Sequence, residues 1–132
     1  MIALDTNVLL RFVTADHDAQ YQLAKNLISN YYGKNKSIYI NTIVLCEFVW
    51  VLKSGYKYSR QQITELLHML VRIEEFEFSE RDEIFEAIVL YQNGGVDFAD
   101  YLIHVINKKK GCLSTYSFDQ QAINDGLFAT LQ

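Results

Sequence analysis

The segment IALDTNVLLR (Ile2–Arg11) decides how this chain of 132 residues is interpreted. Its apolar start predicts a short buried strand, and Asp5-Thr6-Asn7 then supplies the short polar side chains that favour turns and helix N-caps. The apolar residues from Val8 to Phe12 predict a helix. Asp5 therefore directly follows a strand, which is where the ligand sites of parallel sheets form.

Short apolar segments alternate with helical patterns along the rest of the chain. Strands are predicted at Ile2–Leu4, Ile38–Ile40, Phe76–Phe78 and Cys112–Thr115. Helices are predicted at about 17–31, after the caps Asn41-Thr42, Ser59-x-x-Gln62 and Ser79-x-x-Asp82, at about 98–110, and briefly after Asp119. This alternation predicts an α/β fold, a three-layer α/β/α sandwich with a mostly parallel central sheet. With no linker or repeat, residues 1–132 are expected to form one domain.

Composition limits the possible classes of protein. Half of the residues are hydrophobic, which excludes a disordered chain. The net charge of −4 argues against a broad basic face that grips nucleic acid. Cys46 and Cys112 have no metal-ligand spacing, so a reducing environment fits best. No signal peptide or membrane-spanning run is recognised, and we therefore expect a soluble, cytoplasmic protein.

Five acidic residues follow strands or begin helices: Asp5, Glu47, Asp97, Asp100 and Asp119. A parallel sheet would bring such positions to one edge. Gathered carboxylates repel one another unless a cation is present, and an all-oxygen cluster selects Mg²⁺ or Mn²⁺. The chemistry that needs such a site is phosphodiester hydrolysis, with the acids as catalytic residues and metal ligands. Without these five acids, the chain is close to neutral.

Simpler interpretations exist for most of these acids. Asp5 and Asp119 are residue types that cap helices, and Asp97 with Asp100 fits an N-cap followed by an acid at the third helical position. Glu47 is harder to explain, because it interrupts an apolar helix and is costly to bury unpaired. The joint placement favours a functional site over separate caps.

Other polar and aromatic residues carry weaker signals. His17, His68 and His104 share no ligand spacing, and Trp50 is more typical of a core or partner surface than of a base-stacking platform. Lys108–Lys110 is typical of a solvated helix end. The candidates for phosphate contacts with RNA are Arg11, Lys53, Lys57 and Arg60.

Four segments give the chain a resemblance to a known family. They are Ile2–Arg11, Val44–Leu52 around Glu47, Val96–Ile103 with its D-F-A-D run, and Ser117–Asp119. In order and spacing they resemble the PIN-domain ribonucleases, in particular the VapC-type toxins of toxin-antitoxin pairs. The resemblance implies a Mg²⁺-dependent endoribonuclease that cuts single-stranded or looped RNA, a homodimer and a cognate antitoxin.

Carried over position by position, the resemblance assigns the acidic quartet to Asp5, Glu47, Asp100 and Asp119, with Asp97 as an additional acid. It assigns the polar residues that orient these acids to Thr6, Asn7 and Ser117. Two features depart from the family pattern. Tyr101 and His104 stand in a helix that commonly has small residues after the acid, and Ser117 replaces a frequent Thr.

Two other functions agree with parts of the sequence. A phosphoacceptor receiver domain has a similar length, but it needs a second acid beside Asp5, and the flanking residues are Leu4 and Thr6. A non-catalytic module could keep a PIN-like fold as a binding surface, although the complete acidic set argues against it. Neither alternative has the support that the nuclease interpretation has.

Overall fold

The computed structural model describes all residues, 1–132. Its strands are β1 (Ile2–Ala3), β2 (Ile38–Tyr39), β3 (Phe76–Glu77), β4 (Tyr116–Ser117) and β5 (Ala129–Thr130). Its helices are α1 (Thr6–Thr14), α2 (Asp18–Ser29), α3 (Thr42–Ser54), α4 (Arg60–Val71), α5 (Arg81–Asn93), α6 (Phe98–Lys110) and α7 (Gln120–Asn124). No helix is both long and apolar enough to cross a membrane.

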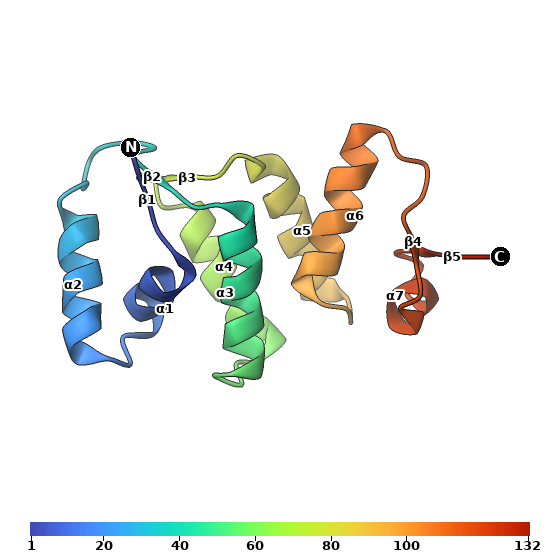
Figure 1. The fold of residues 1–132 in the computed structure, drawn as a ribbon, viewed down its shortest axis with the longest axis horizontal. Coiled ribbons are helices and arrows are strands. Elements are labelled where there is room, and N and C mark those ends of the chain that lie inside the picture. Colours follow the sequence, from blue (N-terminus) through green and yellow to red (C-terminus); the bar gives the residue numbers. More distant parts are fainter.

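All strand pairs are parallel, and this confirms the predicted α/β class. One sheet has the order β1-β2-β3, with Ile2 opposite Ile38 and Ile38 opposite Phe76. The other sheet pairs β4 with β5. Figure 1 shows the first sheet near the N-terminus, and β4, α7 and β5 at the far end of the molecule beyond α6. The strands thus form two small sheets where one continuous sheet was predicted.

The division into two sheets has a local cause. Residues 112–115, predicted as a strand, have no regular structure, and Leu113 is fully exposed. The strand begins only at Tyr116, where the Thr115 carbonyl accepts a hydrogen bond from the Ala129 N–H. Strand β4 therefore pairs with β5 alone.

Helix ends follow the sequence signals in most places. Ser59 and Gln62 form the predicted capping box of α4. Gly111 ends α6 with a positive φ of 102°, after three lysines that suit the helix C-terminus. The predicted Ser79 cap is wrong: Glu80 occupies the N-cap of α5, and the Ser79 hydroxyl contacts the Tyr39 hydroxyl instead.

The core is one continuous cluster beneath these helices. Its largest fully buried side chains are Tyr91, Phe48, Phe76, Phe78 and Phe98. Tyr91 and Phe98 meet edge to face, with ring centroids 5.9 Å apart. Because α6 packs against α5 through this cluster, the start of α6, where two of the predicted site acids lie, is fixed to the core.

Candidate active site

Asp5 lies between β1 and α1 with its carboxylate free. It holds the N-cap position of α1 in extended conformation, at φ −82° and ψ 165°, but its side chain accepts no capping hydrogen bond. The residue is exposed. The interpretation of Asp5 as a side-chain cap is therefore wrong, and its carboxylate remains available for other chemistry.

Glu47 is tied to the same region through Thr6. The buried Thr6 hydroxyl donates to Glu47 Oε1 at 3.2 Å, which links the first residue of α1 to the middle of α3. Glu47 itself is exposed. Its charge is therefore not strongly desolvated, and the Thr6 hydroxyl restrains one of its carboxylate oxygens.

Asp97 and Asp100 lie at the start of α6. Asp97 holds the N-cap position without a side-chain capping bond, and its Oδ1 instead pairs with Lys53 Nζ from α3 at 2.5 Å. Asp100 is half-buried in the first turn. Burial raises the pKa of Asp100 above its usual range, and the nearby negative charges of Asp97 and Asp119 raise it further.

Asp119 comes from the other sheet, directly after β4. Its Oδ1 accepts hydrogen bonds from the N–H groups of Gln121 and Ala122, so the capping interpretation of Asp119 is confirmed. Ser117 fixes the turn, because its Oγ accepts from the Asp119 N–H at 2.9 Å. The cap engages one carboxylate oxygen, and Oδ2 accepts no hydrogen bond.

The acids suit a divalent cation in their chemistry. All are hard oxygen donors, and the mutual repulsion felt by Asp100 is the condition that a bound cation relieves. In the structure, no three acidic, His or Cys side chains are arranged to hold a metal ion. The chemistry of the donors fits Mg²⁺ or Mn²⁺, but their arrangement does not, so binding would require these side chains to draw closer together.

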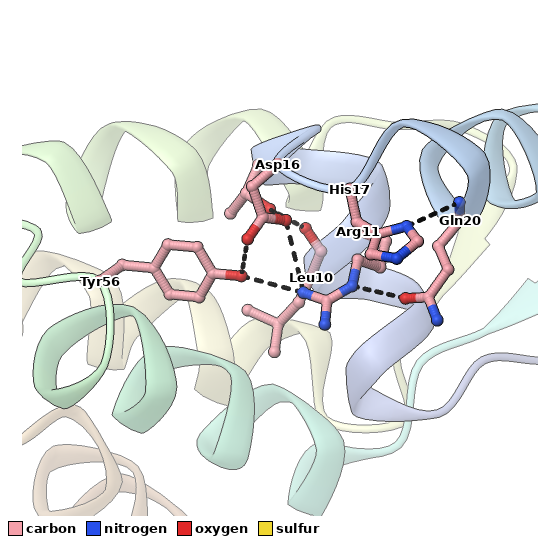
Figure 2. Close-up of polar contacts among 7 residues, drawn as sticks. Leu10, Arg11, Asp16, His17, Gln20 and Tyr56 are labelled. Carbon is pink, nitrogen blue, oxygen red and sulfur yellow. Dashed lines mark hydrogen bonds and ion pairs between the residues drawn. The ribbon is translucent and has the colours of Figure 1, made fainter.

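Two of the four basic candidates make extensive contacts within the chain. Figure 2 shows Arg11 donating to Gln20 Oε1 at 2.7 Å and to the Tyr56 hydroxyl at 3.0 Å, beside Asp16. Arg60 donates to two backbone carbonyls. Lys53 and Lys57 are both exposed, and of the two only Lys53 makes an ion pair, with Asp97. A direct role in RNA contact stays a prediction for all four.

An apolar groove lies beside Arg11, between α1 and α2. It is lined by Asn7, Val8, Arg11, Gln20, Leu23, Ala24 and Leu27. Asn7, predicted to orient the acids, thus lines this groove. It makes no side-chain hydrogen bond to an acid.

The sequence did not reveal the side chains that hold the loop before Asp97. Arg60, Tyr101 and Gln121 contact that loop from three different helices. The sequence signals are ambiguous: Gly94-Gly95 is typical of any helix break, and Tyr101 stands out only as a departure from the family pattern. Long-range contacts of this kind have no local periodicity by which to find them.

The family follows from comparison with known proteins. A family model described as "PIN domain" matches residues 2–124. The chain belongs to the PIN domain family. It is similar to the protein named "VapC ribonuclease" from Aquifex aeolicus (strain VF5), with 30% identity over 121 residues, which are 92% of this chain and 89% of that relative. The resemblance drawn from the four motif segments is thereby confirmed.

Proposed function

We propose that the chain is a Mg²⁺- or Mn²⁺-dependent endoribonuclease and the toxin of a toxin-antitoxin pair. The observation that carries the proposal concerns Asp100. This carboxyl is half-buried at the start of α6, and the negative charges of Asp97 and Asp119 add to the effect of burial in raising its pKa. Asp119 has a structural role as the cap of α7, but that role does not require two further acids beside it. Membership of the PIN domain family and similarity to a VapC ribonuclease support the same activity.

The surroundings of each acid suggest its role in the proposed site. Asp5 and Asp100 are proposed as direct metal ligands, since Asp5 has a free carboxylate and Asp100 gains most from a cation. Glu47, Asp97 and Asp119 complete the site or orient water. A bound divalent ion would neutralise the phosphoryl oxygens and lower the pKa of an attacking water.

The polar neighbours hold these acids in place before any substrate arrives. Thr6 orients Glu47 through its hydroxyl, and Ser117 fixes the turn that presents Asp119. Fixing the groups that hold a metal is worth 10–100-fold in affinity or activity in typical sites. Without a metal ion, the Lys53 ammonium group neutralises the charge of Asp97, and a bound cation would displace it.

The remaining expectations belong to the same proposal. The substrate is single-stranded or looped RNA, the protein acts in the cytoplasm as a homodimer, and a cognate antitoxin inhibits it. The exposed apolar residues, among them Leu23, Ile43 and Trp50, leave surface for protein partners.

The test is cleavage of single-stranded RNA by the purified protein with Mg²⁺, with Mn²⁺ and with EDTA. We expect cleavage with either ion, none with EDTA, and loss of cleavage in Asp5→Asn at an unchanged thermal midpoint. Asp18→Asn, at an exposed aspartate that begins α2, is the matched control and should cleave normally.

Other outcomes would favour the alternatives. RNA bound but uncut in every condition would identify a non-catalytic binding module. Stable phosphorylation by a small phosphodonor would point to a receiver domain. Cleavage by Asp5→Asn at the wild-type rate would contradict the role given to Asp5.

A further inference from the structure

The loop Gly94–Asp97, called the 94–97 loop below, joins α5 to α6 and ends in a proposed site acid. Three side chains from other parts of the fold bind its backbone. Gln121 Nε2 donates to the Gly95 carbonyl at 2.7 Å, and Arg60 Nη1 donates to the Val96 carbonyl at 3.0 Å. The Val96 N–H donates to the Tyr101 hydroxyl at 3.4 Å. A loop that begins with two glycines is thus held at consecutive residues.

Arg60 binds both sides of the connection. The same Nη1 donates to the Tyr91 carbonyl at 3.0 Å, so one guanidinium spans the last turn of α5 and the 94–97 loop. The guanidinium also lies 4.1 Å from the centroid of the buried Tyr91 ring. A planar group that stacks and donates at once cannot be replaced equivalently by Lys.

Tyr101 and Gly94 fit each other closely. A Cβ atom at Gly94 would lie 1.6 Å from the Tyr101 hydroxyl oxygen, and the Gly94 φ of −114° is open to any residue. Glycine is therefore needed here for space and not for backbone conformation. Tyr101 is buried, directly follows Asp100, and donates its hydroxyl to Asp125 Oδ2 at 3.2 Å.

Gln121 connects the loop to the last acid. Its side chain reaches Gly95, while its backbone N–H donates to Asp119 Oδ1 at 3.0 Å. One residue of α7 therefore contacts both the 94–97 loop and the carboxylate that comes from the β4–β5 sheet. The Gln121 contact therefore connects α7 to the 94–97 loop, and the Tyr101–Asp125 hydrogen bond connects the end of α7 to α6.

We propose that Arg60, Tyr101 and Gln121 are positioning residues that fix the 94–97 loop and so hold Asp97 and Asp100 in place relative to Asp119. These three residues are called the loop clamp below. The acids repel one another, so without a fixed backbone the two-glycine connection would let them separate. The clamp's effect on catalysis rests on the proposed function, whereas its effect on the loop does not.

The test uses Tyr101→Phe and Arg60→Lys in the full chain. Their matched controls are Tyr32→Phe and Arg72→Lys, at exposed residues whose side chains make no hydrogen bond or ion pair. We expect the Kd for Mn²⁺, measured by calorimetry, to rise about tenfold in the clamp variants, as it does when groups that orient metal ligands are lost. The kcat for RNA cleavage should fall by a similar factor while KM changes less than about twofold.

Amide hydrogen exchange separates the clamp from the proposed function. Val96 should exchange about tenfold faster in both clamp variants and at the wild-type rate in both controls. Faster exchange with an inactive wild-type protein would support the clamp and defeat the proposed function. Unchanged exchange at Val96, or a lowered thermal midpoint with unchanged Mn²⁺ affinity and kcat, would overturn the clamp.

Discussion

Two polar regions of the molecule shift the pKa of an aspartate in opposite directions. At the junction of α1, α2 and the end of α3, Asp16 accepts hydrogen bonds from Tyr56 and Thr14 and faces Arg11 (Figure 2). The Tyr56 hydrogen bond, with lesser contributions from Thr14 and Arg11, holds the pKa of Asp16 below its usual range. At the start of α6, in contrast, Asp100 stands among like charges and its pKa is raised.

The difference separates a structural cluster from the one that we propose to be functional. Around Asp16, each charge has a partner of opposite sign or a hydrogen-bond donor, and the arrangement is complete as it stands. Around Asp100, burial and the like charges of Asp97 and Asp119 raise the pKa more than a backbone hydrogen bond at Asp97 and the charge of Lys53 lower it. Groups held in an unfavourable state mark sites where a ligand completes the arrangement.

The largest effect is expected from Asp100→Asn. Cleavage of RNA should fall more than about a hundredfold, because even residues that only orient metal ligands cost 10–100-fold. The free energy of unfolding should not decrease, since the substitution removes a half-buried carboxylate that its neighbours repel. A gel assay for cleavage and a thermal melt measure the two quantities. A variant that melts well below the wild type would contradict the view of Asp100 as an unfavourable charge.

The next largest effect is stabilisation by Mg²⁺. A cation that binds only the folded state at a hundredfold excess over Kd contributes about 2.7 kcal/mol, which is a rise of roughly 5–10 °C in thermal midpoint for a domain of this size. The rise should disappear in Asp100→Asn. Differential scanning fluorimetry with Mg²⁺, and with K⁺ at equal ionic strength, tests this. An equal rise with both salts would indicate simple screening.

A smaller effect is expected from Tyr56→Phe in the complete cluster. The hydroxyl accepts from Arg11 and donates to Asp16 at 2.7 Å, and its loss should lower the thermal midpoint by roughly 2–5 °C. The kcat for RNA cleavage should stay at the wild-type value. A large fall in kcat would show that the Arg11 cluster takes part in catalysis.

The smallest effect is an opposite dependence of stability on pH. The folded pKa of Asp16 is lowered from 3.8, so its contribution is present at neutral pH and is lost as pH falls through that folded value. The folded pKa of Asp100 is raised from 3.8, so its carboxylate costs stability above the folded value, and the cost vanishes as pH falls below 3.8. Urea unfolding from pH 3 to pH 7 should therefore show Asp16→Asn falling below the wild type as pH rises, and Asp100→Asn moving above it.

The sequence predicted those parts of the fold that depend on local signals. The first strand and the Asp5 turn, the Ser59–Gln62 capping box and the Gly111 helix end were all found where expected. Each involves residues within a few positions of one another. Hydrophobic periodicity and capping chemistry act over that range, so the order of the helices is predictable from the sequence.

The remainder depends on contacts between distant residues. Residues 112–115 have strand-forming composition, but pairing partners decide whether a strand forms, and β4 begins only at Tyr116. Arg60 looked like a phosphate contact because a charge at a helix start gives no indication that it will stack on Tyr91. The sheet rule predicted that Asp97, Asp100 and Asp119 gather at the edge of one sheet, whereas Asp119 follows β4 of the second sheet. Their mutual repulsion was also expected from the sequence, but the burial that raises the pKa of Asp100 most depends on how α6 packs.

The most direct test of the account is one time course of RNA cleavage by the wild-type protein and Asp100→Asn. Mg²⁺ is present at the start, EDTA is added midway, and excess Mg²⁺ is added back. We predict that the wild type cleaves, stops and resumes, while Asp100→Asn remains inactive throughout. Cleavage that continues through EDTA, or that proceeds equally in Asp100→Asn, would contradict a metal-dependent site built on the acids at the start of α6.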